Sequence, residues 1–353
     1  MSSTASSFSW LPAALEPVAL RLARADELAF QIGDLISAWS YESPLEMKQV
    51  RRGDQVETVL TAIRPVPPRA SLLFSEAVNH IRAALDNMVW HLVEAEHGPL
   101  EGRAALLVAM PITETPEAFE RWCKARTKAG LAVFGGDSAL ATRLHTLQPF
   151  ADRQQVPSVG ATLASVMGIE VETAHPLQLL QAYSNADKHR AVRIAVARTI
   201  SNHSSSPLLS QDLAHRELRV SEVLARATWG TPVLMETNTA AMVQRPEPWA
   251  AWVNPAKELT AMRRYVAQVA VPVLLTGLEL PSGLPPEIDL GDSKAAIRER
   301  LEAGGYDDAD IRLTALVQER FRMAMDRDWA FPDVVDAAGD GSASVPDEPE
   351  VPC

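Results

Sequence analysis

Apolar residues recur at steps of three and four along two long stretches of the chain, residues 16–39 and 71–96. Such spacing places the apolar side chains on one face of an α-helix, so the sequence predicts two long amphipathic helices. The second helix ends before Gly98 and Pro99 and is expected to be the central helix of the core. The apolar positions are Val18, Leu22, Ala25, Leu28, Ile32, Leu35 and Trp39 in the first helix, and Phe74, Val78, Ile81, Leu85, Met88 and Leu92 in the second.

The segment between the two helices has a different pattern. Two β-prone runs, residues 46–50 and 56–63, flank Gly53 and predict a β-hairpin. Further helices are expected over residues 116–128, 138–147 and 176–188, and another begins at 257. Pro272 is expected to bend or end this last helix. Strands are expected at 192–200, 218–220 and 233–236. Strands in blocks, joined by turns and not by regular crossover helices, indicate an α+β fold in which long amphipathic helices pack with antiparallel strands.

Charge and composition suggest how the chain divides. Residues 281–353 hold 17 acidic and 7 basic side chains, most of the net charge of −12. We expect a flexible N-terminus over residues 1–9, a main α+β domain over 10–280, a linker and small acidic helical appendage over 281–335, and a disordered acidic tail over 336–353. An acidic chain without a stripe of cations argues against binding of double-stranded nucleic acid, which depends on clustered positive charge.

Cysteine usage and hydropathy indicate the compartment. Cys123 and Cys353 are the only cysteines, which excludes a disulfide framework and a Cys-rich zinc site. The first ten residues lack the cationic and apolar regions of a signal peptide, and no apolar run is long enough to cross a membrane. The sequence therefore predicts a cytoplasmic protein without a membrane contact, and it carries no cofactor-binding motif that would predict a cofactor.

Polar side chains flank the apolar stripe of the central helix. Asn79, Arg82 and Asp86 lie along one edge of this stripe, at steps of three and four residues. Charges beside a core face lose part of their hydration and need partners. The structural interpretation is that Arg82 and Asp86 pair across one helical turn and attach the helix to a neighbour. The functional interpretation is that they belong to a binding site.

A second polar cluster lies where the helix over 176–188 is expected to meet a strand. It contains Asp187, Lys188, His189 and Arg190. Junctions of this kind often carry functional side chains. Cations at a helix C-terminus also stabilise the helix dipole, which is the structural alternative.

Residues 76–87, 110–112, 147–150 and 183–190, taken in this order, resemble short segments of a family of uncharacterised bacterial proteins that is common in actinobacteria. That family has a His-x-x-Arg-x-x-Leu-Asp helix, a Phe-Pro-Ile step, a Leu-Gln-Pro-aromatic step and a closing Asp-Lys-His-Arg. This chain has Met110 where the family has Phe and Asn87 where His is frequent. The match as a whole spans roughly residues 45–275.

The resemblance implies that Arg82, Asp86, Asp187, His189 and Arg190 meet in space, with Asp86 accepting from Arg190 or His189. It implies no reaction. A His beside a carboxylate could act as a general base, and two arginines could hold an anion. His189, Arg82 and Arg190 are therefore the catalytic candidates, and with Asn79, Asp86 and Asp187 they form the predicted polar cluster.

The preferred function is a non-catalytic binding or interaction module for an unknown protein or a small anionic ligand. The alternative is a metal-independent hydrolase, in its sharpest form an RNase of the HEPN type. Such an RNase uses an Arg and a His four to six residues apart on one helical turn or its edge. Arg198 and His203 have that spacing but lie on a predicted strand.

A metal site was the remaining alternative, because Glu-x-x-His occurs at residues 94–97 and 172–175. This spacing points two ligands from one helix face in di-iron bundles. Both copies come directly before a residue that interrupts a helix, Gly98 or Pro176. The sequence therefore favours no metal site.

Overall fold

The chain folds into an α+β structure in which helices predominate. The computed structural model describes residues 8–167, 170–189, 192–203, 216–230, 235–325 and 334–336. The α-helices in this part are α1 Glu16–Tyr41, α2 Arg69–His97, α3 Gly102–Ala105, α4 Pro116–Lys128, α5 Ala139–Thr146, α6 Ala161–Met167, α7 Pro176–His189, α8 Pro255–Tyr265, α9 Val271–Thr276, α10 Ile297–Glu302 and α11 Ala309–Met325. The strands are β1 Leu45–Arg52, β2 Gln55–Ile63, β3 Val156–Pro157, β4 Thr173–Ala174, β5 Ile194–His203, β6 Arg216–Glu217, β7 Val223–Thr228, β8 Met235–Gln244, β9 Trp252–Val253 and β10 Val334–Asp336.

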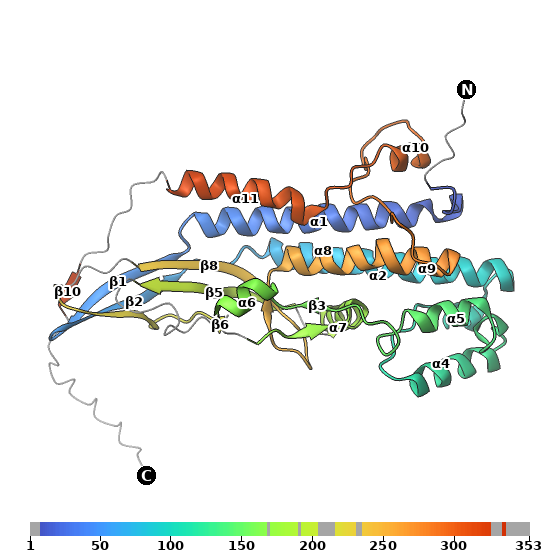
Figure 1. Ribbon diagram of the computed structural model, residues 1–353, viewed down its shortest axis with the longest axis horizontal. Helices are drawn as coiled ribbons and strands as arrows, with labels where there is room; N and C mark the ends of the chain where they lie inside the picture. Colours follow the sequence, from blue (N-terminus) through green and yellow to red (C-terminus); the bar gives the residue numbers. More distant parts are fainter. Residues whose placement is uncertain are drawn as a thin grey trace, which may run out of the picture.

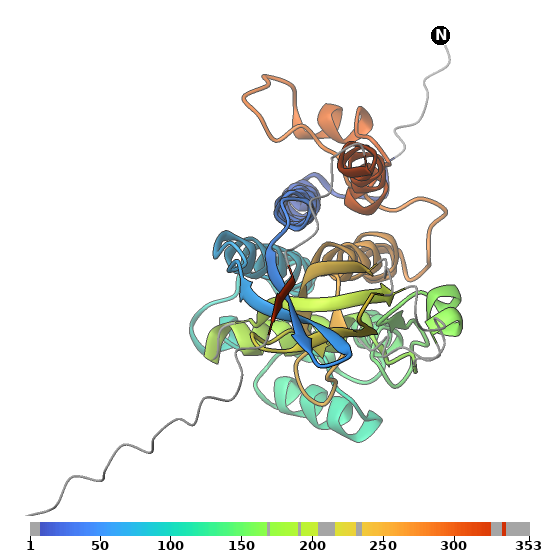
Figure 2. The same ribbon diagram turned by 90° about the vertical axis from the view of Figure 1, so that its left-hand side faces the viewer.

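Three helices, α1, α2 and α8, run side by side along the long axis and form the centre of the molecule (Figures 1 and 2). The predicted amphipathic patterns of α1 and α2 are confirmed, because both helices bury the stripe that the sequence identifies, apart from Leu35 and Leu92, which are partly buried. The strands lie toward one end of this helical layer and α4 and α5 toward the other (Figure 1). Helix α7 contacts both α2 and α8, which places the Asp187 end of α7 beside the central helix.

The strands form two four-stranded sheets and one short pair. The first sheet has the order β10-β1-β2-β7 and the second the order β6-β5-β8-β9, while β3 pairs with β4. The predicted hairpin is confirmed, since β1 and β2 pair antiparallel around Gly53 at φ 65°. Strand β10 adds to β1 in parallel. All other strand pairs in the described residues are antiparallel, as predicted.

Two strand predictions need correction. No strand forms at 218–220: a turn with Ser221 at φ 73° occupies this stretch, and β7 begins only at Val223. The strand predicted over 233–236, of which 233 and 234 lie outside the described residues, belongs to β8, which continues to Gln244 because it pairs with β5 from Met235 to Val243. Local β-propensity cannot report this cross-strand pairing.

The last helices also differ from the sequence expectation. Pro272 does not end the helix that begins at α8: a π-helical turn, η4 Val266–Ala270, leads into α9, whose first turn tolerates the missing N–H of Pro272. The helix ends at Gly277, which adopts the left-handed conformation at φ 79°. The expected helical appendage contains the short helix α10, Ile297–Glu302, and the longer α11, Ala309–Met325.

Residues 281–286, expected as a linker, contribute to the core. Leu284 is 1% exposed, and the buried guanidinium of Arg263 donates to the carbonyl groups of Leu284 and Pro285 at 3.2 and 2.7 Å. Helix α11 then lies along α1 (Figure 1), where the buried Asp26 accepts from Arg312. Of the N-terminus predicted to be flexible over residues 1–9, residues 1–7 lie outside the described part, whereas Phe8 is 1% exposed and packs in the core. Of the tail predicted over residues 336–353, Asp336 is the last residue of β10 and residues 337–353 lie outside the described part. None of the described helices has the length and apolarity that a bilayer crossing requires.

Candidate functional site

Arg82 and Asp86 hold the backbone of Met110 against the central helix. The two side chains pair across one turn of α2, with Nε of Arg82 donating to Oδ2 of Asp86 at 3.1 Å. Arg82 also donates to the carbonyl oxygen of Met110 at 2.9 Å, and the N–H of Met110 donates to Oδ1 of Asp86 at 2.9 Å. The pair therefore binds both backbone polar groups of Met110. This agrees with the structural interpretation that Arg82 and Asp86 pair and attach the helix to a neighbouring segment.

Gln148 holds the next residues of the same segment. Its Oε1 accepts from the N–H and the hydroxyl of Thr113 at 2.9 and 3.0 Å, and its Nε2 donates to the carbonyl oxygens of Pro111 and Leu144 at 3.1 and 2.9 Å. The side chain is fully buried. Segment 110–113 is therefore fixed by α2 on one side and by the end of α5 on the other.

Asp187 pairs with a different part of α2. Its carboxylate accepts from the hydroxyl of Ser75 at 2.5 Å and from the amide of Asn79 at 3.3 Å. The predicted single cluster is thus divided between Arg82 with Asp86 and Asn79 with Asp187. Asp86, which was expected to accept from His189 or Arg190, accepts from Arg82 and from the N–H of Met110 among the described residues. The side chain of His189 and all of Arg190 lie outside the described part of the chain.

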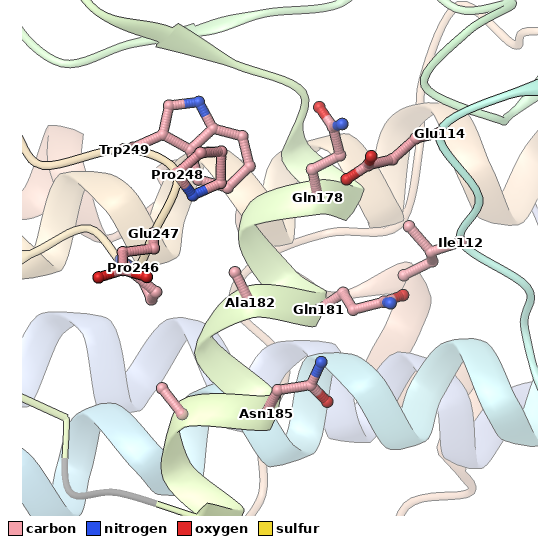
Figure 3. Close-up of a pocket in the computed structure, with 11 residues that line it drawn as sticks. Ile112, Glu114, Gln178, Gln181, Ala182, Asn185, Pro246, Glu247, Pro248 and Trp249 are labelled. Atoms are coloured by element: carbon pink, nitrogen blue, oxygen red, sulfur yellow. The ribbon is translucent and has the colours of Figure 1, made fainter.

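A pocket of about 500 Å³ lies over the exposed face of α7. Figure 3 shows the segment with Ile112 and Glu114 on one side of α7 and the loop over residues 246–249 on the other. The side chains of α7 form its floor, and Trp249 lies against Pro248 in the loop wall (Figure 3). The residues that α7 contributes are Gln178, Gln181, Ala182, Asn185 and Ala186.

A buried ion pair anchors the loop wall of the pocket. Arg245 and Glu258 form a bidentate pair with N–O distances of 2.8 and 3.0 Å, and both side chains are almost fully buried. The same guanidinium donates to the carbonyl oxygens of Val156 and Glu172 at 3.1 and 3.3 Å. These bonds satisfy the buried charge and fix the chain where β8 enters the loop.

Glu172 anchors the other end of this loop. Its carboxylate accepts from the N–H groups of Ala250 and Ala251 at 3.0 and 3.3 Å. Both ends of the 246–249 wall are therefore held by charged side chains. The wall is a fixed part of the structure, as the 110–113 segment is on the opposite side.

Burial perturbs the ionisable groups below the pocket floor. Tyr183 packs its ring edge against Phe74 and donates to Glu258 at 3.3 Å. Burial raises the pKa of the Tyr183 hydroxyl well above its usual value, and it also raises the pKa of Glu258 against the effect of Arg245. These groups are buried among their partners, so they support the pocket and do not line it.

A second buried group lies at the start of α7. Nδ1 of His175 accepts from the N–H of Leu177 at 3.2 Å, which caps the helix, and Nε2 lies 3.4 Å from Oδ2 of Asp152. Tyr265 donates to the same oxygen of Asp152 at 2.6 Å. Burial lowers the pKa of His175, and this effect exceeds the opposite effect of Asp152. The imidazole is therefore neutral at pH 7 and acts as a helix cap.

The polar side chains that line the pocket differ from these buried groups in their hydrogen bonds and ion pairs. Within the described residues, no hydrogen bond or ion pair involves the side chains of Glu114, Gln178, Gln181, Asn185 or Glu247. The polar groups behind the walls, in contrast, are paired. This separation of paired supporting groups from unpaired lining groups is typical of a binding site.

Sequence reasoning missed this pocket because its three walls are distant along the chain. One signal was available: Gln178, Gln181 and Asn185 recur at steps of three and four, which predicts a polar face on α7. The Arg245–Glu258 pair had no such signal, since it joins a strand end to a helix. Its formation depends on tertiary contacts.

The alternative chemistries find no matching geometry. Arg198 and His203 both lie on β5, whereas the RNase chemistry needs them on one helical turn or its edge. In the described part of the chain, no three His, Cys, Asp or Glu side chains are placed to share a metal ion. Glu172 and His175, one of the two Glu-x-x-His pairs, bind the pocket loop and cap α7, respectively.

Comparison with family models, curated proteins and solved structures finds no match for this chain. The resemblance to the actinobacterial family stays a prediction from the sequence. The function is therefore argued from the site alone.

Proposed function

We propose that the protein is a non-catalytic binding module of the cytoplasm whose site is the pocket over α7. The observation that carries this proposal is a set of five polar side chains around one cavity that have no hydrogen bond or ion pair with any residue the structure describes. Unpaired polar groups that face a common space can exchange water for the polar groups of a ligand. A ligand with several hydrogen-bonding groups is the occupant that satisfies them.

The fixed walls support a binding role. Arg82, Asp86 and Gln148 hold one wall, and Arg245 and Glu172 hold the other. Walls that are already ordered need not lose conformational freedom when a ligand binds, which favours affinity. The polar residues of the family-like segments thus act behind the pocket, where they position it.

A binding role is favoured over the hydrolase alternative because Arg82, the catalytic candidate whose side chain is described, does not line the pocket. Arg82 is paired with Asp86, and its second contact is a backbone carbonyl. None of the described pocket-lining residues is a His, Cys, Ser or Lys, and the two carboxylates, Glu114 and Glu247, are exposed and have no partner in the described residues that would activate them as base or nucleophile. The polar groups present are amides and carboxylates, which suit recognition.

The proposal is tested by filling the pocket. Ala182 lies at the centre of the floor (Figure 3), so Ala182→Trp should place an indole in the cavity. A fragment library screened by ligand-observed NMR should give hits with the wild-type protein that are lost with this variant. The matched control is Ala315→Trp, on the exposed face of α11. Hits that persist in Ala182→Trp, or no hits at all, would contradict the assignment of the pocket.

A further inference from the structure

We infer that the pocket takes an organic cation, an amine or guanidinium compound, between Glu114 and Glu247. This inference rests on the proposed function and adds the chemical class of the ligand. It differs from the small anionic ligand that the sequence suggested. That expectation depended on Arg82 and Arg190 as free cations, but the guanidinium of Arg82 is paired with Asp86.

The charge of the pocket is the first argument. Glu114 and Glu247 carry the only charges among the described lining residues, and both are negative. They lie on opposite sides of α7 (Figure 3), so a ligand on the floor has a carboxylate on either side. Both side chains are exposed and have no partner within the described residues. An anion would be repelled by both groups, whereas a cation gains charge-assisted hydrogen bonds.

Trp249 supplies the second argument. Its indole belongs to the loop wall, is partly buried and lies against Pro248 (Figure 3). Cations are attracted to the face of an indole ring, especially where water is partly excluded. The chain already uses this contact elsewhere: Arg126 lies 4.2 Å from the ring centroid of Trp122, and Arg193 lies 5.3 Å from that of Trp252.

The floor of the pocket completes the match to an amine or guanidinium compound. The amide oxygens of Gln178, Gln181 and Asn185 can accept hydrogen bonds from N–H groups of the ligand. Ala182 and Ile112 provide apolar surface for its carbon atoms. A simple metal cation would not use this surface or the indole, so the combination favours an organic cation.

The size of the pocket is consistent with a small molecule. A volume of about 500 Å³ lies within the usual range for small-ligand sites, roughly 300–1,000 Å³. The pocket is a trough between two walls, as Figure 3 shows, and it is not enclosed. A linear amine can therefore lie across α7, with one end toward the wall that carries Glu114 and the other toward the wall that carries Glu247.

Isothermal titration calorimetry with spermidine and agmatine tests the inference on the full chain. We expect saturable binding of at least one of them, and no binding of inorganic phosphate. Glu114→Gln and Glu247→Gln each remove one charge without changing shape, and each should weaken binding by about fivefold or more, because a charge-assisted contact is lost. Trp249→Leu should weaken it as well. Glu101→Gln, an exposed carboxylate outside the pocket, is the matched control and should leave the dissociation constant unchanged.

The outcomes distinguish the inference from the function on which it rests. Amine binding that survives Ala182→Trp, or that is as strong in both glutamine variants as in the wild-type protein, overturns the cation assignment and reports only the attraction of an acidic protein for cations. Fragment hits that are lost in Ala182→Trp while both amines fail to bind overturn the ligand class but keep the pocket as a binding site. If no tested compound loses binding in Ala182→Trp, both the ligand class and the pocket assignment are overturned.

Discussion

Oε1 of Gln148 accepts hydrogen bonds from the backbone N–H and from the hydroxyl of Thr113, at 2.9 and 3.0 Å. With its two donated bonds to Pro111 and Leu144, this single buried amide uses all of its hydrogen-bonding groups. The segment that it holds, residues 111–113, contains Ile112 and comes directly before Glu114, and both of these residues line the pocket. Gln148 therefore connects fold stability to the geometry of the site.

Gln148→Leu should lower the free energy of unfolding by about 2–4 kcal/mol, because the change leaves the polar groups of Pro111 and Thr113 without partners. Urea unfolding followed by circular dichroism measures the loss. Gln154→Leu, at an exposed position, is the control and should stay within about 0.5 kcal/mol of wild type. Equal stability of the two variants would show that Gln148 does not hold the segment.

Asp86→Ala should lower the free energy of unfolding by about 1–2 kcal/mol. The carboxylate binds Arg82 and the N–H of Met110, but its side chain is 34% exposed, so water compensates part of the loss. Asp86→Asn retains an acceptor for Met110 and should lose less. Asp137→Ala, an exposed carboxylate, is the control for thermal unfolding measurements. A larger loss in Asp86→Asn than in Asp86→Ala would contradict this role.

Arg245→Met should be the most destabilising of these changes, by about 3–5 kcal/mol, because it leaves the carboxylate of Glu258 buried without its cation. The double variant Arg245→Met with Glu258→Leu removes both charges and should be more stable than Arg245→Met alone. Chemical denaturation of the two single variants and the double variant gives the coupling energy directly. Additive losses would show that the two side chains do not interact.

Stability should fall on acidification below about pH 6.5, in part through His175. Burial lowers the pKa of His175 from its usual value of 6.5, so the unfolded chain takes up a proton at a higher pH than the folded chain does. The contribution of His175 is thus fully present above pH 6.5 and is lost as pH falls through the lowered pKa. Burial lowers the pKa of His80 as well, so it contributes in the same direction.

His175→Asn tests this contribution, since Asn keeps an acceptor near the position of Nδ1 for the N–H of Leu177. The melting temperature of the variant should depend less on pH between 5.0 and 7.5 than that of wild type. His97→Asn, at the exposed end of α2, serves as the control. An unchanged slope in His175→Asn would exclude this histidine as a source of the pH dependence.

The sequence by itself determined the helices and the hairpin. The periodic apolar residues of α1 and α2 and the Gly53 turn specify these elements through local spacing, and the same spacing put Arg82 and Asp86 within one turn of each other. The predicted α+β class follows from these elements. Such features depend on residues that are close along the chain, which is why a sequence pattern can report them.

The tertiary structure decided the pocket. Its walls come from residues 112–114, from α7 and from residues 246–249, and the groups that fix them, Gln148 and Arg245, bind partners up to 89 residues away. The same holds for Asp187, which pairs with Ser75 and Asn79 and not in one cluster with Asp86. Contacts of this kind form only when helices and strands pack, because a side chain can bond only to partners that packing brings within hydrogen-bonding distance.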